Sequence, residues 1–203
     1  MKNKEAWRPS KFGFRDGKLM ASRDLREVGY SSRLMGDRVA ACYEPALRDY
    51  ARGRLLDLGC GKVPFYEAYR DHVPENICVD WAEGPHGNSY LDLEHDLTKD
   101  LPFAEGEFDT ILLSDVLEHL PEPARLWAEM HRVLVPGGRV LMNVPFYYWI
   151  HEHPHDFYRY TEFALRRFAE EAGFRVMVLK PIGGLPEIMA DTFAKNIDNV
   201  RGG

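Results

Sequence analysis

From Gly53 onward the chain alternates short apolar segments with helical patterns, and this alternation limits the fold more than any other feature. Helical patterns are clearest at residues 123–134 and 161–172. The apolar segments are predicted strands at residues 54–58, 76–80, 89–93, 109–114, 139–144 and 175–180. Strands that alternate with helices form right-handed crossovers, so we predict an α/β fold with a doubly wound, mostly parallel sheet and helices on both faces. Ligands of such sheets gather at the carboxyl ends of the strands.

The first quarter of the chain has a different pattern, and we expect an N-terminal cap at residues 1–50 ahead of a main domain at 51–203. Asp16 and Gly17 stand between two short runs and predict a β-hairpin with a two-residue turn. A helical pattern follows at residues 32–50. The tail is predicted to form one more amphipathic helix, and no seventh strand follows it.

Composition excludes several classes of function. The 32 acidic and 26 basic residues are interspersed and give a net charge of −6, so we expect no nucleic-acid partner. Cys42, Cys60 and Cys78 are an odd number without metal-type spacing, which favours a reducing, cytoplasmic location. The longest apolar stretch, residues 140–150, is interrupted by an asparagine and a proline and is too short to span a bilayer. Peripheral membrane contact and the oligomeric state are left open.

A glycine-containing loop follows the first strand of the main domain. The stretch LLDLGCGKVPF joins residues 54–58 to a helix through Gly59 and Gly61. Glycines allow a tight turn and a close approach of ligand to backbone, while the start of a helix offers free N–H groups. Asp80 ends the next strand, about twenty residues on, where a carboxylate can accept hydrogen bonds from ribose hydroxyls. The pattern therefore predicts a site for a ligand that carries a ribose.

Five ordered motifs resemble those of class I S-adenosylmethionine-dependent methyltransferases, in the branch that methylates small molecules and sugars. They are DLGCG at 57–61, VDW at 79–81, HDL at 95–97, FDTILLSDVLEHLPEP at 108–123 and VLVPGGRVLMNVP at 133–145. The resemblance covers residues 54–180 and implies a Rossmann-like fold with S-adenosylmethionine as cofactor. Val63 replaces the third glycine that this family commonly has, and the family's final strand has no counterpart.

The same resemblance assigns residues to the methionine portion of the donor. Asp57 and the backbone of Gly59, Cys60 and Gly61 would face this portion, and Ser114 would line the same side. Since the donor sulfonium is positively charged, an acid-lined pocket would suit it better than it would suit a pyrophosphate.

Four further residues are assigned to the nucleoside of the donor. Asp80 would hold the two ribose hydroxyls, and Trp81 would lie against the adenine ring. Asp96 and Leu97 would meet the edge of the adenine through a side-chain acceptor and a backbone donor.

The segment HEHPHDFYRY, residues 151–160, follows the fifth predicted strand and so begins beside the expected donor site. If its backbone is extended, His151, His153 and His155 share one side and could face a metal. Histidines spaced by one residue are seldom a complete site, and we assign no metal. A second interpretation is a polar loop that caps the next helix, with Thr161 as the N-cap.

We favour a third interpretation, in which this segment forms the acceptor pocket. A hydroxyl that accepts a methyl group must lose its proton as the bond forms, and a neutral imidazole oriented by a carboxylate can remove it. The predicted base is His155 with Asp156, or His151. The residues predicted to contact the acceptor are His119, Tyr158, Arg159 and Tyr160.

The sequence thus predicts a methyltransferase that acts on an oxygen of a sugar, nucleotide-sugar or glycan. One alternative is a phenolic or quinone-type acceptor, which the apolar residues 146–149 would support. Another is a protein that binds the donor without turnover and acts as a regulator.

Overall fold

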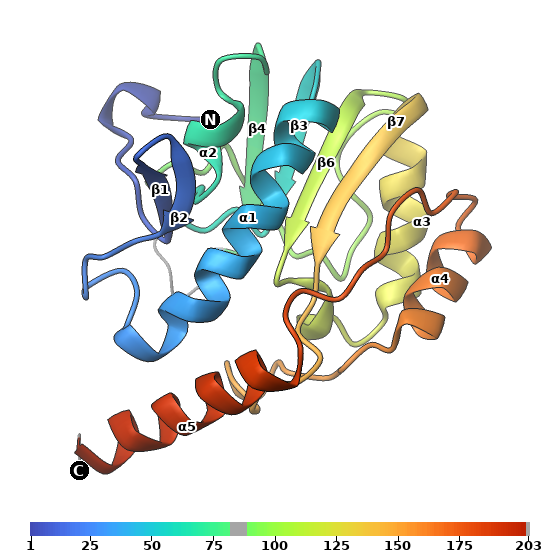
Figure 1. Cartoon of the computed structure of the whole chain (residues 1–203). Helices are drawn as coiled ribbons and strands as arrows, with labels where there is room; N and C mark the ends of the chain where they lie inside the picture. The colour runs from blue at the N-terminus through green and yellow to red at the C-terminus, as the bar shows by residue number, and fades with distance from the viewer. Residues whose placement is uncertain (82–88, 202–203) are drawn as a thin grey trace.

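A computed structural model describes residues 1–81 and 89–201, with the backbone alone for residues 198–201. Its centre is a five-stranded sheet in the order β5-β4-β3-β6-β7, and all neighbouring strands are parallel (Figure 1). The strands are β3 (Arg54–Leu58), β4 (Glu75–Asp80), β5 (Leu93–Glu94), β6 (Phe108–Ser114) and β7 (Leu134–Asn143). The predicted doubly wound, Rossmann-like sheet is confirmed.

Helices cover both faces of this sheet. α1 (Arg33–Tyr50) and α2 (Tyr66–Tyr69) pack on one face, α3 (Pro123–Val133) and α4 (Glu162–Glu171) pack on the other, and α5 (Leu185–Arg201) lies against α1. Along β3 the side chains alternate, so that Leu55 packs in the cluster with α1 while Leu56 and Leu58 pack in the cluster with α3. A strand buried on both faces is expected to be apolar throughout, and Asp57 is the exception in β3.

The N-terminal hairpin forms as predicted, from β1 (Phe12–Arg15) and β2 (Lys18–Ala21). Its turn residues Asp16 and Gly17 have φ of 52° and 75°, the positive values that a type I′ turn needs. The Phe12 ring stacks on Phe65 at 4.6 Å between centroids, which holds the hairpin against the segment that follows the glycine loop. The hairpin and α1 therefore share one apolar core with the sheet.

Two strand predictions were wrong. Residues 89–93 were expected to form a strand, but only Leu93–Glu94 pair with β4. Residues 175–180 form no strand, because an extended segment becomes a strand only where it meets an edge with which it can pair. Beside β7, the described residues hold no further strand in this sheet.

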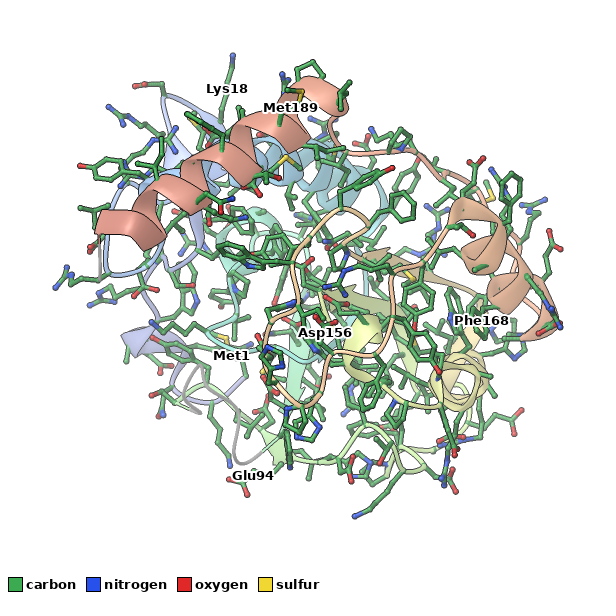
Figure 2. The ribbon with its side chains drawn as sticks, turned by 90° about the horizontal axis from the view of Figure 1, so that it is seen from below. Met1, Lys18, Glu94, Asp156, Phe168 and Met189 are labelled. Atoms are coloured by element: carbon green, nitrogen blue, oxygen red, sulfur yellow. The ribbon has the colours of Figure 1, made fainter. Side chains whose placement is uncertain are left out.

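The remaining helix predictions are confirmed, including α4 and the tail helix α5. Thr161 caps α4, since its hydroxyl oxygen accepts a hydrogen bond from the Ala164 N–H at 3.2 Å. No helix in the described part of the chain has both the length and the apolar character to cross a bilayer. Viewed from the side where the strands end, the loop that carries Asp156 crosses the middle of the molecule (Figure 2).

Candidate functional site

The loop after β3 is shaped by two glycines in left-handed conformation. Gly59 and Gly61 have φ of 70° and 48°. A Cβ at Gly59 would lie 2.3 Å from a methyl carbon of Val116, a distance that no side chain can accept. The loop is therefore restricted to glycine at position 59 by both its conformation and its close contact with the chain after β6.

Val63 adopts the conformation of the glycine it replaces. Its φ is 51°, which is rare for a β-branched residue and costs about 1–3 kcal/mol. The side chain is fully buried, and the Val63 carbonyl accepts a hydrogen bond from the indole N–H of Trp7 at 3.2 Å. Packing thus holds the residue in this strained conformation, and the loop keeps the path that a third glycine would give it.

Asp80 lies against the glycine loop at the end of β4. Its Oδ2 accepts a hydrogen bond from the Gly61 N–H at 2.6 Å, and its Oδ1 accepts one from the Trp81 N–H at 2.7 Å. The carboxylate therefore sits where the ends of β3 and β4 meet, as the ribose assignment requires.

Asp57 is a buried carboxyl whose charge is not balanced. It is 4% exposed, and its Oδ2 has no hydrogen-bond partner. Burial, together with the nearby charge of Asp80, raises its pKa to about 8. A positively charged ligand beside Asp57 would stabilise the ionised form of this carboxyl. A glycine loop, an acid at the tip of the next strand and an unpartnered buried carboxyl fit S-adenosylmethionine, which carries a sulfonium and an ammonium.

The predicted adenine contacts are placed near this region, and their roles stay predictions. Asp96 Oδ1 accepts hydrogen bonds from the Thr98 hydroxyl at 2.7 Å and the Thr98 N–H at 3.0 Å, and these bonds lower the pKa of Asp96. Leu97 is buried in the core on the α3 side of the sheet, and the Trp81 ring is 45% exposed.

A network that the sequence analysis missed joins the ends of β6 and β7. The hydroxyls of Ser114 and Tyr43 donate to Asn143 Oδ1 at 2.8 and 2.7 Å. The Asn143 amide donates in turn to Asp115, and Lys11 Nζ lies 3.0 Å from Asp115 Oδ2. Asp115 falls within a recognised motif, but nothing in the sequence links it to Lys11, which reaches it from the N-terminal segment.

In the acceptor loop, the partner of Asp156 is His151. Asp156 Oδ2 lies 3.1 Å from His151 Nδ1 and accepts the His151 backbone N–H at 2.9 Å. His155 is exposed, and its ring makes an edge contact with Trp81 at 5.2 Å. The predicted pairing of His155 with Asp156 is therefore wrong: Asp156 is paired with His151, the other candidate base.

The other predicted acceptor residues have partners within the protein. The Arg159 guanidinium bonds to Asp156 and to the carbonyls of Tyr148 and Trp149, and it holds the pKa of Asp156 well below its usual range. Tyr160 is buried, and its hydroxyl donates to the Leu117 carbonyl at 3.0 Å. The Tyr158 hydroxyl donates to the carbonyl of residue 121 at 2.9 Å. In this structure, Arg159 and Tyr160 hold the loop in place.

His119 belongs to a cluster at the end of β6. Its Nδ1 lies 2.7 Å from the His155 carbonyl, and its ring makes an edge contact with His151 at 4.9 Å. The neighbouring Glu118 side chain is 0% exposed. Burial and the nearby charge of Asp115 raise the pKa of Glu118 to about 8. His119 was predicted from the sequence and Glu118 was not, although its position directly after the apolar pair Val116 and Leu117 was a signal of a buried carboxyl.

One cleft connects the two halves of the site. Its wall includes Gly59–Lys62, Ser114, Glu118 and His151, together with residues 143–148. The glycine loop and the acceptor loop therefore open onto the same space.

Comparisons with known proteins relate the middle of the chain to methyltransferases. Residues 56–142 match a family described as a methyltransferase domain. A curated relative from Xanthomonas oryzae pv. oryzae, the ubiquinone biosynthesis O-methyltransferase, is 29% identical over 111 residues, which are 50% of this chain and 46% of the relative. An uncharacterized methyltransferase from Mycobacterium sp. (strain KMS) is 38% identical over 114 residues, 52% of this chain and 44% of the relative.

A solved methyltransferase structure has the same fold. One chain of the complex between the Haloferax volcanii Trm112 methyltransferase activator and a methyltransferase superposes with a TM-score of 0.59 at 23% identity. The match covers 70% of this chain and 72% of that one. The chain therefore shares the fold of this methyltransferase, and it spans somewhat less than half the length of the curated relatives it matches.

Proposed function

We propose that the protein transfers a methyl group from S-adenosylmethionine to a hydroxyl oxygen of a phenolic or quinone-type molecule. One observation carries the proposal: the glycine loop of the donor site and His151, which is paired with Asp156, line the same cleft. The name of the Xanthomonas relative supports a quinone-type acceptor over the sugar that the sequence analysis preferred.

The donor half of the proposal uses residues from the ends of two neighbouring strands, β3 and β4. S-adenosylmethionine, when bound, supplies a methyl group activated by its positive sulfur. Asp57 would contribute a negative charge near that cation, and Asp80 would accept hydrogen bonds from the ribose hydroxyls.

The acceptor half depends on a proton. As the hydroxyl oxygen forms its bond to the methyl carbon and the bond from carbon to sulfur breaks, the hydroxyl proton must leave. Arg159 keeps Asp156 ionised, and Asp156 fixes the orientation of the His151 ring. The His151 ring is the group that would take that proton. A cation bound beside His151 would instead favour its loss from the hydroxyl.

The wall of the cleft next to His151 suits an aromatic ring. Phe146, Tyr147 and Tyr148 line the cleft and keep large exposed surfaces. Lys195 from α5 lies over the Tyr148 ring at 4.1 Å, so the tail helix steadies this wall. Exposed aromatic side chains beside a cleft favour a flat apolar acceptor.

The proposal is tested by offering the donor with separate pools of phenolic and sugar acceptors and measuring the release of S-adenosylhomocysteine. Release with phenolic acceptors is expected, and His151→Gln should lower turnover about a hundredfold with unchanged donor affinity. His153→Gln, two residues away on an exposed side chain, is the control and should behave as wild type. Release with sugars alone would restore the acceptor class predicted from the sequence. Donor binding without any release would favour a regulator.

A further inference from the structure

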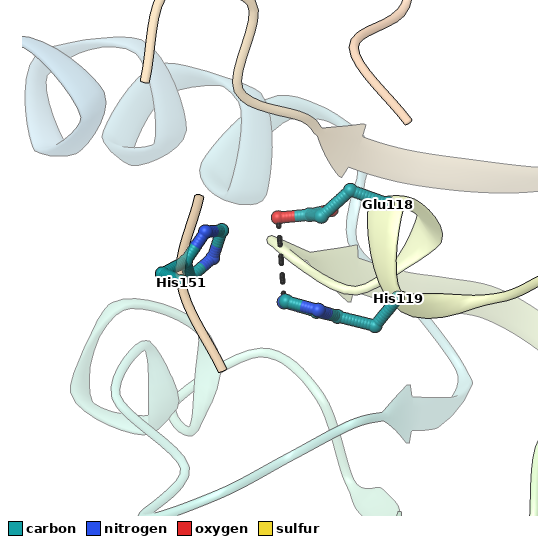
Figure 3. A group of neighbouring side chains, drawn as sticks. All are labelled: Glu118, His119 and His151. Atoms are coloured by element: carbon teal, nitrogen blue, oxygen red, sulfur yellow. Dashed lines mark ion pairs between the residues drawn. The ribbon is translucent and has the colours of Figure 1, made fainter. Parts of the chain in front are cut away.

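Glu118, His119 and His151 converge at the carboxyl edge of the sheet (Figure 3). The first two belong to the 3₁₀ helix η3 (Leu117–His119) just after β6, and the third comes from the loop after β7. One ligand atom of each residue lies within 4.8 Å of those of the other two. The three residues therefore form a cluster that the linear sequence does not reveal.

The buried Glu118 carboxylate lacks hydrogen-bond partners. Neither of its oxygens has a hydrogen-bond partner, although its side chain is completely buried. His119 Nε2 lies 3.7 Å from Glu118 Oε1, which is beyond hydrogen-bonding distance. A buried, unpartnered carboxyl is costly in free energy, and a bound cation would remove that cost.

Both histidines have a hydrogen-bond acceptor beside their Nδ1 atom. His119 Nδ1 faces the His155 carbonyl at 2.7 Å, and His151 Nδ1 faces Asp156 at 3.1 Å. Because a carbonyl and an ionised carboxylate only accept hydrogen bonds, each Nδ1 carries the proton and each Nε2 keeps a lone pair. Metal-binding imidazoles usually have such a carboxylate or carbonyl behind them, which fixes the ring and its tautomer.

The charges around the cluster also favour a cation. The charges of Lys11 and Arg159 reach Glu118, but Lys11 is paired with Asp115 and Arg159 is paired with Asp156. A second carboxylate, Glu152, brings an oxygen to within 3.8 Å of His119 Nε2.

We propose that Glu118, His119 and His151 bind a divalent first-row transition-metal ion, with zinc as the best fit. Two imidazoles and one carboxylate are a common ligand set of catalytic zinc, which keeps a further position open. Ligands at about 2.1 Å in a tetrahedron stand about 3.4 Å apart, so a separation of 3.7 Å needs only small side-chain movement.

The open position would face the cleft, because both Glu118 and His151 line it. Its ligand would be a water molecule or, on the basis of the proposed methyl transfer, the acceptor hydroxyl, whose pKa a metal lowers. This ligand set differs from the run of histidines in the sequence: His153 takes no part, and His155 contributes only its carbonyl oxygen behind His119.

Isothermal titration of the metal-free protein with zinc chloride tests the site. Wild type should bind one ion per chain, and Glu118→Gln, His119→Gln and His151→Gln should each weaken binding about a hundredfold or more. His153→Gln is the matched control and should bind as wild type. Cobalt(II) in place of zinc should show nitrogen and oxygen ligation without a thiolate absorption band.

Titration with S-adenosylhomocysteine shows that each variant is folded and separates this proposal from the methyl-transfer proposal. Absence of stoichiometric zinc binding in wild type overturns the site, as does equal weakening by His153→Gln or a thiolate band from the cysteines. Zinc binding without methyl transfer supports the site and contradicts the proposed function. Full methyl transfer in the presence of a chelator contradicts the role of the open position.

Discussion

Asp57→Asn offers a sharp test of the donor site, because the buried Asp57 carboxyl destabilises the donor-free protein. Its pKa is raised from 3.8 to about 8 by burial and by Asp80. The unfolded chain releases this proton at lower pH than the folded chain, so stability falls as pH rises from about 4 to about 8. At pH 7 the pH lies roughly three units above the pKa of the unfolded chain. The buried carboxyl therefore lowers the free energy of unfolding by at most about 4 kcal/mol, at about 1.36 kcal/mol per unit.

Asparagine removes the charge while keeping the shape, so Asp57→Asn should raise the melting temperature of the donor-free protein by several degrees at pH 8. The gain should shrink toward zero near pH 4. Thermal unfolding across this pH range measures the effect. Asp96→Asn is the control and should lower stability at neutral pH, because the Thr98 hydrogen bonds favour the ionised Asp96. An Asp57→Asn variant that is no more stable than wild type at pH 8 would refute the reasoning.

The same carboxyl makes donor binding depend on pH. A positively charged donor favours ionised Asp57, so affinity should rise with pH up to about 8 and then level off. The other titratable groups whose charges reach Asp57 are Asp80, Cys60, Tyr43 and Tyr69, and none of these is a cation. Calorimetry in buffers of different ionisation enthalpy should show proton release on binding, and Asp57→Asn should abolish it.

Three further substitutions test other parts of the account. Val63→Gly should destabilise the protein less than Val79→Gly, because relief of about 1–3 kcal/mol of backbone strain offsets part of the lost packing. Urea unfolding measures both variants, and an equal loss of unfolding free energy in the two would contradict this. Thr161→Ala should cost about 1 kcal/mol by removing the cap of α4, and an unchanged urea midpoint would contradict that role. Trp81→Ala should weaken donor binding, measured by calorimetry, with no change in melting temperature, since the ring is largely exposed.

Much of the sheet could be predicted from the sequence, because β3, β4 and β6 each contain a short cluster of apolar residues bounded by turns. The strand predicted at residues 175–180 failed for a reason that lies outside its own residues. An alternating apolar pattern shows that a segment can be extended, but pairing depends on a neighbouring edge, which local sequence does not describe.

The functional site, like the sheet, could be predicted from the sequence only in part. Gly59, Gly61 and Asp80 occupy the places that the loop pattern predicted, because strand ends and glycine turns fix them locally. The partner of Asp156 depended on the path of the loop. Glu152 has a φ of 51°, so the backbone is not extended there and Asp156 turns back to His151.

The convergence of Glu118 with His151 was also beyond prediction, since two different strand ends create it. The sequence gives the residue types of such a cluster, but only the tertiary structure gives their distances.

The central claim is that the crevice formed by the glycine loop and Asp80 binds S-adenosylmethionine. Calorimetric titration with S-adenosylhomocysteine, using wild type and Asp80→Ala, tests it most directly. Wild type should bind one molecule per chain. The affinity of Asp80→Ala should be about ten- to a hundredfold weaker, because charge-assisted hydrogen bonds worth about 1.5–3 kcal/mol are lost. No binding to wild type, or equal affinity in both proteins, would contradict it.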